Sequence, residues 1–248
     1  MSTATQLSRN LLRVRIARYT TPDGAAFGVV DGDSAGGAAT IQRIEGHPFA
    51  PFTLTGEPQP LGEVRLLAPV LPSKVVAIGR NYAEHAKELG NDSDPMAEPP
   101  IVFLKPSTSV IGPGESIAYP VGVSDEVHFE GELGVVIARL CREVPKERVR
   151  DVVLGFVCAN DVTARDLQRA ESQWGRAKGF DTFCPLGPWI ATDLDPADLA
   201  VTTTVNGELR QAGRTSQMLR GIDELVAHVS QAMTLLPGDV ILTGTPAG

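Results

Sequence analysis

The segment from Val127 to Ile137, VHFEGELGVVI, constrains this chain most, because two glutamates open a run that is otherwise apolar. Such a run predicts a β-strand that is at least partly buried. Side chains two residues apart on a strand share a face, so Glu130 and Glu132 are expected roughly 6.5–7 Å apart along it. Buried like charges are unfavourable without a partner, and a hard divalent ion such as Mg²⁺ or Mn²⁺ takes oxygen ligands of this kind. Taken alone, the pair is better explained by a rim strand whose glutamates face water.

A third carboxylate follows where the apolar residues 152–159 give way to a helical pattern. Asn160 or Asp161 is a typical N-cap residue and predicts that the helix begins there. Asp161, Arg165 and Gln168 then stand at i, i+4 and i+7, on one helical face. The carboxylate suits a metal, whereas the guanidinium and the amide suit the oxygens of an anionic substrate. The alternative is a surface Asp–Arg pair worth roughly a few tenths of a kcal/mol. Beside the glutamate pair, the functional interpretation is preferred.

A histidine and a glutamate occupy a short predicted helix within GRNYAEHAKELG, residues 79–90. Gly90 is a typical stop signal for that helix. His85 and Glu88 stand at i and i+3, close enough for the carboxylate to orient the imidazole. Such a pair can take a proton from water near neutral pH. A histidine on a surface helix is more often only a polar residue, so the spacing by itself does not decide for catalysis.

Six motifs in a fixed order carry a resemblance to a known enzyme family. They are GRNY (79–82), FLKP (103–106), EGELG (130–134), NDVTARD (160–166), RAKGFD (176–181) and LTGTP (242–246). No single motif is specific, but the ordered set is. The chain from about residue 70 to residue 248 resembles the fumarylacetoacetate hydrolase family, and most closely its small bacterial members that act on acylpyruvates, oxaloacetate or related 2-oxo dicarboxylates. The resemblance implies a distorted β-roll as the catalytic domain.

The resemblance assigns a metal site and a water-orienting pair to residues already reached from spacing. It implies that Glu130, Glu132 and Asp161 bind a divalent cation, Mg²⁺ or Mn²⁺. It further implies that His85 and Glu88 orient a catalytic water. Spacing and resemblance lead independently to these residues, which is the main reason to trust the assignment.

The resemblance also assigns four residues to the substrate, of which Arg165 and Gln168 were already reached from spacing. Lys178 is expected to be an electrophilic lysine that stabilises a developing enolate or oxyanion. Without the resemblance, Lys178 would be interpreted as an ordinary solvated lysine. Arg165, Gln168 and Thr245 are expected to grip the substrate, which the resemblance implies to be a small anionic 2-oxo acid.

The sequence departs from the family in one respect, because it stops at Gly248, directly after Thr245-Pro246. Family members continue there through further strands that help to close the catalytic domain. Either the sequence is shortened or these final strands are missing from the protein. The resemblance also implies a homodimer formed through the large β-domain.

Composition excludes several classes of partner. With 22 basic against 30 acidic residues the net charge is −8, which argues against nucleic acid and anionic membranes, since both require a basic surface. No apolar run approaches the ~20 residues of a membrane span, and the polar first ten residues lack the apolar core of a signal peptide. The chain has 3 cysteines, an odd number, and they lie in or beside apolar runs. This argues against a disulfide framework. A cytoplasmic protein is expected.

Many short strands and few helices predict an α+β fold with a mixed, curved sheet. We expect a small N-terminal β-domain over residues 1–70, with a loose tail of ten residues, and a catalytic domain over residues 71–248. Val205-Asn206-Gly207-Glu208 predicts a tight hairpin, and an amphipathic helix is expected over residues 222–236. The polar, proline-rich residues 91–100 are explained equally well by an inert loop and by a lid over the site.

The leading functional expectation is metal-dependent cleavage of a C–C bond next to a 2-oxo acid, by hydrolysis of an acylpyruvate or a fumarylacetoacetate-like substrate. The substrate would chelate the metal through its carboxylate and its 2-oxo oxygen. Oxaloacetate decarboxylation and 2-hydroxyhepta-2,4-diene-1,7-dioate isomerisation use the same electron sink, so the sequence separates the three reactions poorly. An alternative of another class is a non-catalytic metal- or anion-binding protein. A structural ion requires none of the polar residues around the three carboxylates, so an enzyme is preferred.

Overall fold

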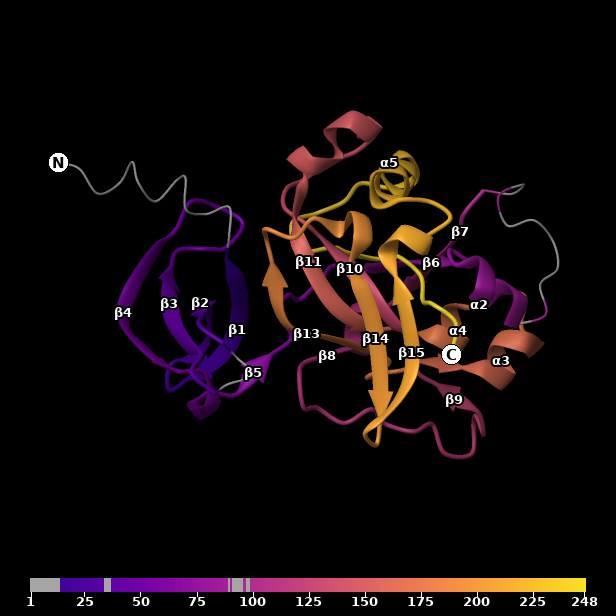
Figure 1. Ribbon diagram of the computed structural model, residues 1–248, viewed down its shortest axis with the longest axis horizontal. Helices are drawn as coiled ribbons and strands as arrows, with labels where there is room; N and C mark the ends of the chain where they lie inside the picture. The colour runs from indigo at the N-terminus through magenta and orange to yellow at the C-terminus, as the bar shows by residue number, and fades with distance from the viewer. Residues whose placement is uncertain (1–13, 34–36, 89, 91–95, 97–98) are drawn as a thin grey trace.

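The computed structural model describes the whole chain except residues 1–13, 34–36, 89, 91–95 and 97–98 (Figure 1). The predicted N-terminal tail therefore lies outside the described residues, as does most of the proline-rich segment 91–100. The two interpretations of that segment, an inert loop and a lid, thus stay predictions. No helix in the part of the chain that is described is long and apolar enough to cross a membrane.

The N-terminal part contributes short antiparallel strands that lie at the left of Figure 1. They are β1 (Arg15–Thr21), β2 (Gly24–Asp31), β3 (Thr40–Glu45), β4 (Thr53–Pro60) and β5 (Leu66–Leu67), with the 3₁₀ turn η1 (Leu61–Glu63) between β4 and β5. Tyr19 of β1 and Ile41 of β3 are buried in a small core that belongs to this part of the chain. This part is the predicted β-rich N-terminal region.

The remaining elements form the larger part of the molecule (Figure 1). The strands are β6 (Val75–Gly79), β7 (Ile101–Lys105), β8 (Val110–Ile111), β9 (Val127–His128), β10 (Gly131–Ile137), β11 (Val153–Asn160), β12 (Thr163–Ala164), β13 (Cys184–Ala191), β14 (Ala200–Val205), β15 (Glu208–Arg214) and β16 (Val240–Leu242). The α-helices are α2 (Ala83–Glu88), α3 (Arg165–Ala170), α4 (Gly175–Lys178) and α5 (Ile222–Ala232). The 3₁₀ helices are η2 (Ser107–Ser109), η3 (Lys146–Asp151), η4 (Pro196–Asp198) and η5 (Thr215–Gln217).

One 12-stranded sheet runs through both parts, in the order β4-β3-β2-β1-β13-β11-β10-β16-β6-β7, with β5 and β8 attached to β1 and β13. The join is antiparallel pairing of β1 with β13, where Ile16 lies opposite Ile190. Pairing is also antiparallel between β10 and β11 and between β10 and β16, but β16 runs parallel to β6. The predicted α+β fold with a mixed sheet is confirmed.

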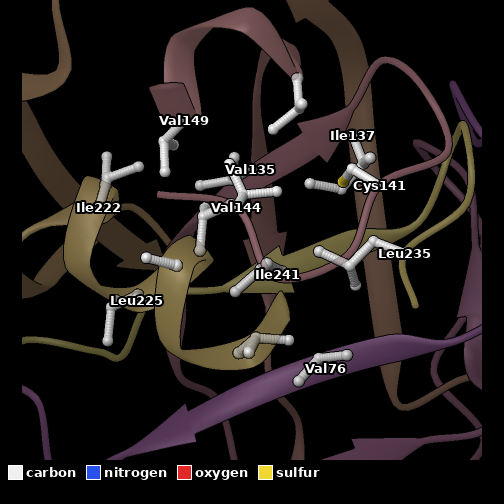
Figure 2. Packing of buried hydrophobic residues seen from close by; sticks show 14 of the residues in the cluster. Val76, Val135, Ile137, Cys141, Val144, Val149, Ile222, Leu225, Leu235 and Ile241 are labelled. Carbon is white, nitrogen blue, oxygen red and sulfur yellow. The ribbon is translucent and has the colours of Figure 1, made fainter. Parts of the chain in front are cut away.

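Strand β10 is buried on both faces, as its nearly continuous apolar sequence predicts. Val135 and Ile137 point to one side and pack with α5, whereas Val136 points to the other side and packs with β13 and β16. Figure 2 shows Ile222 and Leu225 of α5 facing the same cluster as Val135. Each fully buried side chain of this kind stabilises the fold by about 1.5–3 kcal/mol. Packing on both faces thus fixes the position of β10, which carries Glu132 and directly follows Glu130.

The structure confirms the predicted hairpin and shortens the predicted amphipathic helix. The hairpin forms as expected between β14 and β15, because Asn206 and Gly207 both adopt positive φ, 53° and 82°, as a type I′ turn requires. The amphipathic helix is shorter than expected, since α5 ends at Ala232 and the chain turns through extended Met233 toward β16.

Candidate metal centre and active site

Three buried carboxylates converge at one end of β10. Glu130 precedes β10, Glu132 lies within it, and Asp161 follows the neighbouring strand β11. Gly131 of β10 pairs with Asn160 of β11, so the backbone N–H of Asp161 donates to the carbonyl of Glu130 at 2.8 Å. One oxygen atom from each carboxylate lies within 4.8 Å of the other two. The cluster is therefore compact enough to share one cation.

The predicted strand over residues 127–137 is interrupted at Phe129 and Glu130. Val127-His128 pairs separately with β12, and the ladder with β11 begins only at Gly131. The backbone N–H of Glu130 donates to the side-chain oxygen of Asn160, 2.9 Å away, in place of a strand partner. The continuous strand was wrong in detail, yet both glutamate side chains still reach the cluster.

The prediction that a helix begins at Asn160 or Asp161 is wrong. Helix α3 begins at Arg165, after the extended residues Thr163 and Ala164 of β12, and no side chain caps it. Asp161 cannot serve as a cap because both its oxygens are engaged: Lys105 Nζ lies 2.6 Å from Oδ1 and Lys178 Nζ lies 2.7 Å from Oδ2. Asp161 is held toward the cluster by two lysines rather than by a helix end.

Two cations hold Glu130. Lys178 Nζ lies 2.7 Å from its Oε2, and the guanidinium of Arg165 contacts its Oε1. Burial by itself would raise the pKa of Glu130, but the charges of Lys178 and Arg165 outweigh it and lower the pKa. Burial likewise opposes the charge of Lys178, yet the charges of Asp161 and Glu130 raise the pKa of this lysine. At neutral pH Glu130 is thus a carboxylate and Lys178 an ammonium.

Glu132 differs from its two neighbours because it forms no salt bridge with any residue that the structure describes. Its Oε2 accepts a hydrogen bond from the backbone N–H of Gly244, at 2.7 Å. Burial, then repulsion by Asp161 and by Glu130, raises the pKa of Glu132 well above its ordinary value. A buried set of oxygen donors with one acid left uncompensated fits a hard divalent cation such as Mg²⁺ or Mn²⁺.

His85 of α2 lies directly beside this cluster. Its Nε2 is 3.8 Å from Oε1 of Glu130, and its Nδ1 is 3.3 Å from Oε2 of Glu88. Burial lowers the pKa of His85, and the opposing charges of Glu130 and Glu88 do not restore it. The imidazole is therefore neutral at neutral pH and able to accept a proton. Glu88 is half exposed and also accepts a hydrogen bond from the backbone N–H of Gly248.

The structure brings all the predicted site residues together around one cavity of about 430 Å³. The members of this set are His85, Glu88, Glu130, Glu132, Asp161, Arg165, Gln168, Lys178 and Thr245. Gln168 contacts the guanidinium of Arg165, both on α3. The Thr245 hydroxyl donates to the carbonyl of Gly131 at 2.9 Å, which ties the segment after β16 to β10.

Sequence reasoning missed the aromatic wall of the cavity. Phe103 of β7 and Trp174, just before α4, meet edge to face with ring centroids 5.4 Å apart. Lys178 Nζ lies 5.2 Å from the centre of the Phe103 ring. Trp174 therefore both packs against Phe103 and lines the cavity. The signal available for this wall was the FLKP motif, which includes Phe103.

Strand parity alone would place His128 on the face of Glu130, but His128 is exposed and does not line the cavity. Its ring lies 3.2 Å from the carboxylate of Glu126. The break at Phe129 and Glu130 explains the difference, because parity does not carry across an interrupted strand.

Comparison with known proteins gives matches to two family models. Residues 74–248 match the fumarylacetoacetate (FAA) hydrolase C-terminal model, and residues 14–69 match the Rv2993c-like N-terminal model. Among solved structures, the chain is similar to 5-carboxymethyl-2-hydroxymuconate delta-isomerase from Mycobacterium smegmatis, with 52% identity, a TM-score of 0.86, and coverage of 94% of this chain and 89% of that one.

Two further relatives are informative. A 2-hydroxyhepta-2,4-diene-1,7-dioate isomerase from Mycobacterium marinum is 48% identical, with a TM-score of 0.86 and coverage of 95% of this chain and 88% of that one. Oxaloacetate tautomerase YisK of Bacillus subtilis is 44% identical over 76% of this chain and 64% of its own length. With a family model that covers most of the sequence and a buried acidic site to match, this chain belongs to the fumarylacetoacetate hydrolase family.

Proposed function

We propose that this protein is a divalent-metal-dependent isomerase that moves a proton between keto and enol forms of a 2-oxo dicarboxylic acid. The observation that carries the proposal is a buried, neutral histidine, His85, whose Nε2 lies 3.8 Å from an oxygen of the carboxylate cluster. A proton carrier beside an electron sink is what keto–enol exchange requires. The names of the three relatives support this reaction class over the hydrolysis that the sequence led us to expect.

Glu130, Glu132 and Asp161 would hold the ion, and their all-oxygen donor set favours Mg²⁺ or Mn²⁺. When bound, such an ion polarises the 2-oxo group and makes the protons on the neighbouring carbon more acidic. The remaining chemistry belongs to the side chains around the cavity.

His85 would take a proton from the carbon next to the 2-oxo group and return it to another position of the conjugated system. Lys178 would stabilise the negative charge that develops on the substrate oxygen. Its raised pKa keeps it an ammonium, so we assign it a fixed charge rather than the role of a base. Arg165, Gln168 and Thr245 line the same cavity and would hold the carboxylate of the reacting end.

Hydrolysis is the second candidate, and the His85–Glu88 pair favours it. A hydrolase must aim a water as well as move a proton, and misplacement by an ångström is costly in rate. Glu88 is half exposed and its oxygen lies 3.3 Å from both His85 Nδ1 and the N–H of Gly248, so it holds the imidazole loosely. Isomerisation needs only His85 itself, which is why we rank it first.

The decisive experiment follows keto–enol exchange of oxaloacetate by ultraviolet absorbance, and cleavage of acetylpyruvate, with Mg²⁺ and with a chelator. We expect Mg²⁺-dependent exchange of oxaloacetate that the chelator abolishes. His85→Gln should lower that rate by roughly 10²–10⁴-fold. Fast acetylpyruvate cleavage without any acceleration of exchange would reverse the ranking of the two candidates.

A further inference from the structure

Three arginines line the cavity, and one of them has no partner among the described residues. Arg165 contacts Glu130 and Gln168, and Arg169 contacts both oxygens of Glu126. Arg80, which follows β6, lines the cavity but forms no hydrogen bond or ion pair within the described part of the chain. The cavity therefore presents one guanidinium whose charge no described protein group has satisfied.

The backbone holds Arg80 in an unusual conformation. Its φ is 58°, in the left-handed region that favours glycine or asparagine over a long side chain. The residues on either side of Arg80 are closely packed. A Cβ at Gly79 would collide with the indole ring of Trp174, and Asn81 is fixed because its side chain donates to the carbonyls of Arg220 and Thr243, at 3.0 and 2.8 Å.

Backbone strain of this kind persists where the surroundings over-determine it, and it clusters at functional sites. A glycine at position 80 would satisfy the turn without strain. An arginine at this position lowers the stability of the fold relative to glycine. A function of its side chain accounts for its presence. Arg80 thus combines a strained backbone with a side-chain charge that has no partner among the described residues. This combination indicates that a ligand binds its guanidinium.

The topology places Arg80 at a useful separation from the carboxylate cluster. Strand β6, which ends just before Arg80, is separated from β10 by β16. Two strand spacings amount to roughly 9–10 Å between the two backbones. A chain of several carbons, held at one end by the carboxylate cluster and Lys178, can present its other end to Arg80.

We propose that Arg80 binds the distal carboxylate of the substrate and so selects dicarboxylic over monocarboxylic 2-oxo acids. The inference rests on the proposed function, in which the 2-oxo acid end of the substrate lies at the carboxylate cluster. A guanidinium suits this task because it binds a carboxylate through two parallel hydrogen bonds. Arg169 is less suited, since Glu126 already occupies its guanidinium.

The test measures binding rather than turnover. Two ligands that share an oxalyl head are titrated into the Mg²⁺-loaded protein by calorimetry: oxalate, which has no distal carboxylate, and N-oxalylglycine, which has one. In Arg80→Gly the affinity for N-oxalylglycine should fall about ten- to a hundredfold, and that for oxalate should change less than about twofold. Arg80→Lys, which keeps the charge but loses the paired geometry, should fall between wild type and Arg80→Gly.

Folding is controlled by the choice of variant. Glycine adopts the left-handed backbone readily, so the Tm of Arg80→Gly should stay within a few degrees of wild type. Arg176→Ala removes a positive charge from α4 outside the cavity, where it contacts Glu171. This charge-matched control should leave both affinities unchanged.

Equal losses for the two ligands, or no loss for either, would overturn the assignment of Arg80. If wild type bound neither ligand in the presence of Mg²⁺, the proposed function would itself fail. The kinetic counterpart compares kcat/KM for keto–enol exchange of oxaloacetate with that of phenylpyruvate, a monocarboxylic 2-oxo acid. Arg80→Gly should lower the first selectively, and a parallel loss on phenylpyruvate would contradict the inference.

Discussion

The side-chain nitrogen of Lys105 lies 2.6 Å from Oδ1 of Asp161, and both side chains are buried. The same nitrogen donates to the carbonyl of Val162 at 3.2 Å. Lys105 does not line the cavity, so it faces the carboxylate cluster from within the protein. It compensates the charge of Asp161 from behind, while Lys178 does so from the cavity side.

Replacing Lys105 by methionine should destabilise the metal-free protein by about 3–5 kcal/mol, because a buried carboxylate would lose its counter-charge. Added Mg²⁺ should then raise the Tm of Lys105→Met by more than it raises that of wild type, since the ion supplies the missing positive charge. Thermal unfolding with and without Mg²⁺ measures both effects.

The matched control is Lys146→Met, which removes an exposed lysine 3.8 Å from Glu224. Surface pairs contribute about 0–1 kcal/mol, so this variant should unfold close to wild type at every Mg²⁺ concentration. A Lys105→Met protein as stable as the control would show that Asp161 does not depend on Lys105.

The second prediction concerns Glu132→Gln. Without a cation the raised pKa favours the protonated acid, which glutamine resembles in shape and charge, so the metal-free protein should unfold near the wild-type Tm. The stabilisation by Mg²⁺, about 2.7 kcal/mol at a hundredfold excess over Kd for wild type, should be lost. Calorimetric titration with Mg²⁺ checks the binding directly, with Glu126→Gln, at a partly exposed carboxylate paired with Arg169, as control. Undiminished binding in Glu132→Gln would remove Glu132 from the ligand set.

The sequence was sufficient to predict the fold class and the composition of the carboxylate cluster, because both depend on local patterns. Period-2 alternation and an apolar run placed Glu130 and Glu132 near each other. Helical spacing placed Arg165 and Gln168 on one face, and α3 does carry both. The ordered motifs added Lys178 and Thr245, but not the aromatic wall formed by Phe103 and Trp174.

Other features depend on long-range contacts that no local pattern encodes. The strand breaks at Glu130 because Asn160, 30 residues away, takes its backbone N–H. Asp161 is not a helix cap because Lys105, 56 residues away, holds one of its oxygens. The left-handed backbone of Arg80 is not signalled by the sequence either, since arginine rarely adopts it, although Gly79 and Asn81 stand beside it in the GRNY motif.

The third prediction is the pH dependence of catalysis. Burial lowers the pKa of His85 below its ordinary value of 6.5, so the neutral base persists below that pH. Activity should be constant above the lowered pKa and fall as the pH falls through it, because the imidazole is then protonated. With saturating Mg²⁺, kcat/KM measured from about pH 5 to 8 should break below the ordinary histidine pKa, about 6.5, and His85→Gln should lack this break. An acidic limb that persists in His85→Gln would assign it to another group.

The fourth prediction is the oligomeric state, for which the family membership leads us to expect a homodimer. The segment that links β8 to β9 exposes several apolar side chains, namely those of Ile117, Tyr119, Val121 and Val123. Clusters of exposed apolar side chains mark protein–protein contacts. Light scattering at micromolar concentration should give the mass of a dimer, and Val121→Asp should shift it toward the monomer. A monomeric wild type would contradict the expectation.

The last prediction concerns stability and Asp239, which is buried where the chain turns into β16. Its Oδ1 accepts hydrogen bonds from the backbone and hydroxyl of Ser73, and its Oδ2 accepts from Lys74 Nζ and from the backbone N–H of Leu236. Burial alone would raise the pKa of Asp239, but the bonds from Lys74, Ser73 and Leu236 outweigh it and lower the pKa. The carboxylate thus ties the start of β6 to the start of β16.

Asp239→Asn should cost about 2–4 kcal/mol at neutral pH, somewhat less than a fully buried pair, because Lys74 is partly exposed. A depressed pKa contributes stability that is complete above the unfolded-state pKa, about 3.9, and is lost as the pH falls through the lower folded-state pKa. The gap in unfolding free energy between wild type and Asp239→Asn should therefore be constant from about pH 8 to about pH 5 and narrow below about pH 4.

Asp198→Asn, at an exposed pair with Arg214, is the control and should change stability far less. Urea unfolding across this pH range measures the difference in unfolding free energy between wild type and Asp239→Asn. If that difference stayed constant down to the lowest pH at which wild type folds, the charge of Asp239 would not be what stabilises the turn.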